Sequence, residues 1–95
     1  MFERGMVTTK YPMQYVKVDL KELSSIADYL NKIDPKNRAK ICADGLMTVS
    51  DVYELGCSFI VDKENQYIIL MGWRVFDVLD EEDFCKLYEI TKSII

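Results

Sequence analysis

The chain has 95 residues, a formal net charge of -4 and no histidine, and 49% of its residues are hydrophobic. This length fits one folded domain over residues 1–95, and the apolar fraction is large enough to build a core, which argues against disorder. The absence of histidine removes the most common general base and the most common zinc ligand, so most hydrolase chemistry is excluded. We therefore expect a non-enzymatic protein with no catalytic residues, cofactor or metal.

The sequence shows no membrane-spanning segment and no secretion signal. No apolar run approaches the roughly 20 residues that a membrane-spanning helix needs. Residues 1–10 contain Glu3 and Arg4 and lack the apolar segment of a signal peptide. The three cysteines, Cys42, Cys57 and Cys85, form no Cys-x-x-Cys pair, which favours reduced thiols. A cytoplasmic protein that does not bind membranes is the expectation.

The first elements are a strand and a helix. Residues 1–12 are expected to be a loosely ordered N-terminal segment, and the apolar alternation over residues 14–18 predicts a strand. Asp19 is a helix N-cap with Glu22 as its capping-box partner, so we expect a helix over residues 20–33. Its apolar residues recur at helical spacing and give one stripe for the core, made of Leu20, Leu23, Ile26, Ala27, Leu30 and Ile33.

Residues 35–44 fit two structures. As a helix, the segment has Asp34 as cap, Pro35 at its first position and Gly45 just past its end. As a strand, it alternates between apolar and mostly polar residues. We favour the helix because caps at both ends are independent of periodicity, and we keep the strand as the alternative.

Two strands follow a short helix. Thr48 and Gly56 are the start and stop signals of a helix over residues 49–55. Apolar runs then predict strands over residues 57–62 and 67–76, and their four-residue spacing favours a hairpin between them. The sequence thus predicts an α+β fold with about three strands.

The strand over residues 67–76 is apolar on both faces. Helices that cover both faces would explain this pattern, because central strands are buried on both sides. The alternative is an open apolar face that binds a partner or a second copy of the chain. Tyr67 and Trp73 lie on this strand and are candidate partner-binding residues, although large aromatic side chains in such a strand more often belong to the core.

Acidic residues mark the start of the last helix, expected over residues 81–95. Negative charge is favoured at a helix N-terminus by the helix dipole, so a structural role explains these residues. The functional alternative is an acidic surface that docks on a basic protein or inhibits a nucleic-acid enzyme. The candidate residues of that surface are Asp77, Asp80, Glu81 and Glu82.

The order of the middle elements resembles a winged-helix domain. Helices over residues 35–44 and 49–55 would form a helix-turn-helix, with the hairpin after them as the wing. Such a protein would be a DNA-binding regulator, and the basic residues Lys32, Lys36, Arg38 and Lys40 fit that function. The predicted recognition helix exposes no lysine or arginine, and the chain is acidic overall, which disfavours nucleic acid.

The function that the sequence favours is a non-enzymatic interaction or regulatory module. It would bind a partner protein, or associate with itself, through an apolar sheet face or the acidic helix start. The DNA-binding regulator and the inhibitor of a nucleic-acid enzyme are the alternatives.

Overall fold

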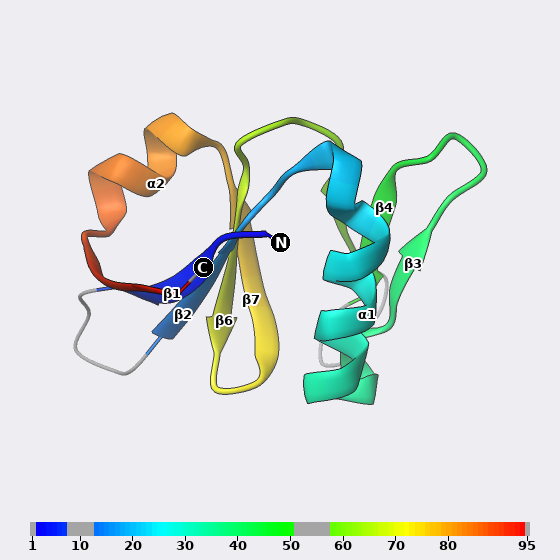
Figure 1. Ribbon diagram of the computed structural model, residues 1–95, viewed down its shortest axis with the longest axis horizontal. Coiled ribbons are helices and arrows are strands. Elements are labelled where there is room, and N and C mark those ends of the chain that lie inside the picture. The colour runs from blue at the N-terminus through cyan, green and yellow to red at the C-terminus, as the bar shows by residue number, and fades with distance from the viewer. Residues whose placement is uncertain (1, 8–12, 51–57, 95) are drawn as a thin grey trace.

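The computed structural model describes residues 2–7, 13–50 and 58–94 of the chain, and Figure 1 shows their arrangement. These residues form two α-helices, two short 3-10 turns and strands in two sheets. The elements in chain order are β1 (Arg4–Val7), β2 (Met13–Lys17), η1 (Leu20–Glu22), α1 (Leu23–Ile33), η2 (Pro35–Asn37), β3 (Ala39–Ile41), β4 (Met47–Ser50), β5 (Ser58–Val61), β6 (Tyr67–Met71), β7 (Arg74–Leu79), α2 (Glu81–Leu87) and β8 (Ile90–Ile94).

The strands of the described residues belong to a five-stranded sheet and a three-stranded sheet. The larger sheet has the order β7-β6-β2-β1-β8 and the smaller one β3-β4-β5. All neighbouring strands are antiparallel. The α+β class predicted from the sequence is confirmed, whereas the expected number of about three strands was too low, because eight are present in the described part of the chain.

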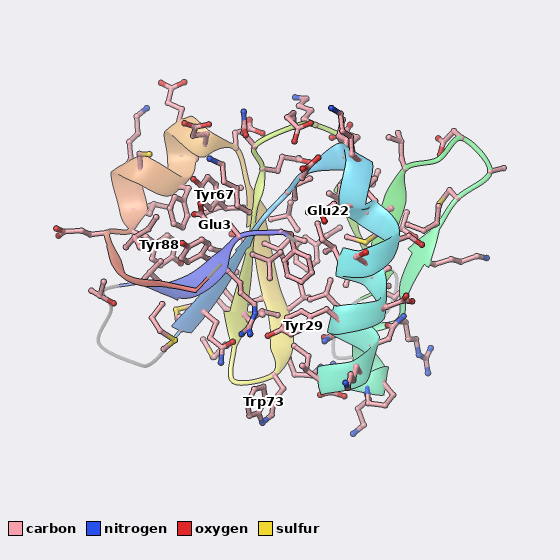
Figure 2. The ribbon with its side chains drawn as sticks, in the orientation of Figure 1. Glu3, Glu22, Tyr29, Tyr67, Trp73 and Tyr88 are labelled. Atoms are coloured by element: carbon pink, nitrogen blue, oxygen red, sulfur yellow. The ribbon has the colours of Figure 1, made fainter. Side chains whose placement is uncertain are left out.

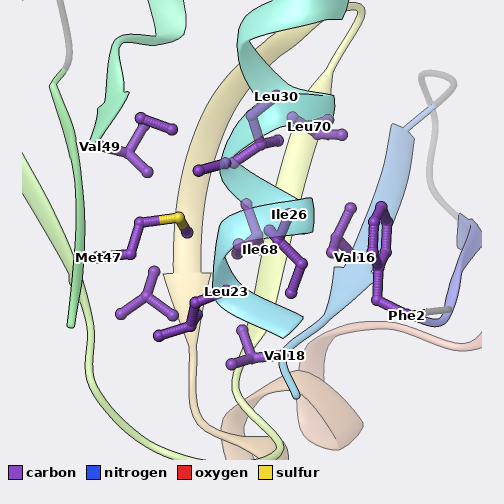
Figure 3. Packing of buried hydrophobic residues seen from close by; sticks show 13 residues of the cluster. Phe2, Val16, Val18, Leu23, Ile26, Leu30, Met47, Val49, Ile68 and Leu70 are labelled. Carbon is purple, nitrogen blue, oxygen red and sulfur yellow. The ribbon is translucent and has the colours of Figure 1, made fainter. Parts of the chain in front are cut away.

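The main core lies where α1 packs between the two sheets (Figures 1 and 3). Side chains from β2 and β6 meet α1 on one side, and side chains from β4 meet it on the other. Burial of this apolar surface provides the main stabilisation of the fold. The buried members of the cluster are Phe2, Val16, Val18, Leu23, Ile26, Ala27, Leu30, Ala39, Met47, Val49, Val61, Ile68 and Leu70.

A second, smaller core lies on the opposite face of the five-stranded sheet, beneath α2. Successive side chains of a strand point to opposite faces of the sheet, so the residues between those of the main core point to this second face. The face carries both aromatic and aliphatic side chains, and Phe84 of α2 is 2% exposed against them. The buried members are Val7, Met13, Tyr15, Tyr67, Ile69 and Phe84.

The predicted strand over 14–18 and helix over 20–33 are both confirmed. The Asp19 carboxylate accepts a hydrogen bond from the Lys21 backbone N–H at 2.9 Å, but it caps the 3-10 turn η1, and α1 begins at Leu23. Four of the stripe residues are buried, and Leu20 is exposed. Local capping and helical periodicity were sufficient to predict this helix, because both act within a few residues.

The predicted helix over residues 35–44 was wrong, and the strand alternative is correct for Ala39–Ile41. Pro35–Asn37 form only a 3-10 turn, which ends at Arg38 with a left-handed φ of 49°. The Asn31 side chain then donates to the Ala39 carbonyl at 2.9 Å and accepts from its N–H at 2.8 Å. These two bonds hold the segment against α1 in extended form.

The predicted helix over residues 49–55 was also wrong for residues 49 and 50. Val49 and Ser50 belong to β4, which pairs with β3 and β5, and residues 51–55 lie outside the described part. Gly45, interpreted as a helix stop, has a φ of 87° in the turn between β3 and β4. The helix-turn-helix of a winged-helix domain is therefore not formed by the described residues.

The predicted strands over 57–62 and 67–76 do not pair with each other. β5 pairs with β4 in the small sheet, and β6 pairs with β2 and β7 in the large one. The loop between them leads from one sheet to the other. Gln66 Oε1 stabilises this loop by accepting hydrogen bonds from the N–H groups of Asp62 and Lys63 at 3.0 and 2.9 Å. The segment 67–76 is moreover not one strand, since it turns at Gly72 and Trp73.

The predicted helix over residues 81–95 is correct only for its first half. Helix α2 ends at Leu87, because Tyr88 has an extended backbone with φ -135° and ψ 153°. The chain continues as β8, which pairs with β1 at the edge of the large sheet. Ile90 and Thr91 are β-branched and favour a strand, and the pairing with β1 supplies backbone hydrogen bonds that the sequence alone does not reveal.

The N-terminal segment was expected to be loosely ordered over residues 1–12. Arg4–Val7 instead form β1, between β2 and β8, while residues 8–12 lie outside the described part. Among the described residues, no helix has both the length and the apolar character needed to cross a membrane.

Candidate protein-interaction surface

The β6–β7 hairpin ends in a two-residue turn made of Gly72 and Trp73, because Met71 pairs with Arg74. Gly72 has a φ of 62°, in the left-handed region. Glycine at the first central position is what a type II′ hairpin turn requires. The dipeptide Gly72-Trp73 between two apolar runs was therefore a turn signal, which the prediction of one long strand missed.

Asn37 fixes the hairpin end to the rest of the molecule. Its side chain is 2% exposed. The side-chain Nδ2 donates to the carbonyl oxygens of Leu30 and Trp73, both at 2.9 Å, and Oδ1 accepts from the N–H of Val75 at 3.0 Å. The end of α1 and the hairpin turn are thus joined through one buried amide, which holds the backbone of Trp73 in place.

Three large apolar side chains near this turn are exposed. The exposed fractions are 45% for Met71, 58% for Trp73 and 50% for Phe76. Strand alternation places Met71 on the α2 side of the sheet, opposite to Ile68 and Leu70 of the main core. Figure 2 shows Trp73 at the far end of the hairpin. We call Met71, Trp73 and Phe76 the hairpin patch.

The hairpin patch is open because α2 covers only the other end of this sheet face. Tyr67 and Phe84 stack there with ring centroids 3.8 Å apart and an interplanar angle of 3°. The sequence left open whether the strand from residue 67 is covered on both faces. Residues Tyr67–Leu70 are buried, so both faces are covered in β6 up to Leu70, and exposure begins at Met71.

Tyr67 is a core residue in the structure. It is 5% exposed, and Lys17 Nζ lies 5.9 Å from its ring centroid. Burial, and then interactions with Glu3, Glu81 and Cys85, raise the pKa of Tyr67 from 10.0 to about 12. Figure 2 shows Tyr67 and Tyr88 on the α2 side of the sheet, away from Trp73. The structure thus separates two aromatic residues that the sequence placed on one strand.

The acidic candidates Asp80, Glu81 and Glu82 lie beyond the end of β7 opposite Trp73, and Asp77 lies within β7 itself. Asp77 is partly buried, and its carboxylate accepts from the Val78 N–H at 2.8 Å. Asp80, Glu81 and Glu82 are exposed at the start of α2, where Glu82 Oε1 lies 3.3 Å from Lys86 Nζ. Because a strand rises about 3.3 Å per residue, β7 separates Trp73 from Asp80 by about 20 Å.

A shallow polar pocket of about 280 Å³ lies elsewhere, near the end of β2 and the loop before β6. Its carboxylates all have structural partners. Glu3 accepts from the Tyr15 hydroxyl at 2.8 Å, Asp19 accepts from the Lys21 N–H at 2.9 Å, and Glu64 accepts from the Leu20 N–H at 3.3 Å. No set of metal-ligating side chains is gathered among the described residues. The lining residues are Phe2, Glu3, Lys17, Val18, Asp19, Glu64 and Asn65.

Comparison of the chain with protein-family models, with curated proteins and with solved structures found no match.

Proposed function

We propose that this protein is a non-enzymatic interaction module that binds a partner protein through the hairpin patch. The observation that carries the proposal is the exposure of Trp73, 58%, on a turn whose backbone is fixed by Asn37. Tryptophan is enriched among the residues that dominate binding energy at protein interfaces. An anchored turn presents such a side chain without the entropy cost of ordering a loop on binding.

The neighbours of Trp73 support the same function. Met71 and Phe76 add exposed apolar surface on the same hairpin, and methionine adapts its shape to different partners. Large exposed apolar side chains weaken solubility when they have no role. A partner that covers the hairpin patch would remove all three from water, and burial of that kind drives most protein association.

The test is retention of a partner by the purified chain. We expect proteins that co-purify with the tagged wild-type chain from its own cells to be lost in the variant Trp73→Ser. The matched control is Ile60→Ser, because Ile60 has the same exposed fraction, 58%, but lies on β5 of the other sheet. Equal loss in both variants, or no loss in Trp73→Ser, would contradict the proposal.

Self-association through the hairpin patch is the homo-oligomer form of the same proposal. Sedimentation of the wild-type chain over a range of concentrations separates it from binding to another protein. Trp73 is the single tryptophan of the chain, so its emission reports directly on whether the hairpin patch becomes buried.

The acidic start of α2 is a second candidate surface. Asp80, Glu81 and Asp83 are exposed there and form no ion pair within the described part of the chain. Such a surface would dock on a basic protein, including an enzyme that acts on nucleic acid. Reversing Glu81 and Glu82 to lysine would then weaken partner capture and reduce its dependence on salt.

A further inference from the structure

We draw no further inference here: the strongest candidate, the exposed apolar surface of Met71, Trp73 and Phe76 at the end of the β6–β7 hairpin, belongs to the site already described, and nothing in residues 2–7, 13–50 and 58–94 shows what covers it.

Discussion

At the scale of single residues, Asn37 links the fold to the candidate site. A buried amide costs free energy unless its donors and acceptor are paired, and all three hydrogen bonds of Asn37 go to backbone groups. Two of those groups, the Trp73 carbonyl and the Val75 N–H, belong to the hairpin end. Asn37 thereby also blocks this part of the β7 edge from pairing with another strand.

Replacing Asn37 with alanine should destabilise the protein by about 2–4 kcal/mol, because the partner groups of a buried amide are left unsatisfied. Urea unfolding measures this change. The neighbouring variant Lys36→Ala is the control, because an exposed side chain without partners contributes within about 0.5 kcal/mol. Equal stability of the two variants would show that Asn37 does not hold the hairpin end.

At the scale of elements, β6 and α2 depend on each other. Helix α2 spans Glu81–Leu87 and is too short to be stable alone, so packing must hold it. That packing comes from the stacked pair of Tyr67 and Phe84, with Tyr15 and Tyr88 at ring centroid distances of 5.8 and 5.7 Å from Phe84. The short length of α2 is also the reason that the hairpin patch remains uncovered.

The raised pKa of Tyr67 predicts a loss of stability in alkali. Its pKa is about 12 in the folded chain against 10.0 as the ordinary value, so folding favours the neutral phenol. This contribution is complete below the unfolded pKa and is lost as the pH rises through the folded pKa. The difference in unfolding free energy between wild type and Tyr67→Phe should therefore change by about 2 kcal/mol between about pH 9 and pH 12.

Urea unfolding of both proteins at several pH values measures this difference. Other tyrosines and the lysines titrate in both proteins, so their effects cancel in the comparison. A difference that does not vary with pH would mean that the Tyr67 hydroxyl is as well solvated in the folded chain as in the unfolded one.

At the scale of the whole molecule, charge is distributed unevenly. Exposed carboxylates gather at the start of α2, whereas the exposed residues Lys36 and Arg38 flank Asn37, whose side chain bonds to the backbone at the start of β7. The two candidate surfaces are thus separated by the length of one strand. Since they share no side chains, mutations at one should leave the other intact.

Reversal of Glu81 and Glu82 to lysine should leave Trp73-dependent partner binding within about threefold of wild type, because distant exposed charges are screened and act independently. Capture of the co-purifying partner by this variant and by Trp73→Ser checks the prediction. A combined variant that binds much more weakly than the product of the single effects would indicate that the two surfaces form one interface.

The sequence by itself determined the α+β class, the strand at β2 and the helix α1 with its buried stripe. It also identified Asp80 as the boundary before α2. These features depend on capping, periodicity and helix-dipole effects, which act within about one turn of the chain. Trp73 could be selected as a candidate from its residue type, and Gly72 beside it carried a turn signal.

Only the tertiary structure decided the rest. Residues 39–41, 47–50 and 90–94 are strands because partners distant in sequence complete their hydrogen bonds, and in all three segments helical signals competed locally. The same long-range pairing placed β5 and β6 in different sheets and buried Tyr67 beneath α2. It left Met71, Trp73 and Phe76 exposed, because no local pattern predicts where a covering helix ends.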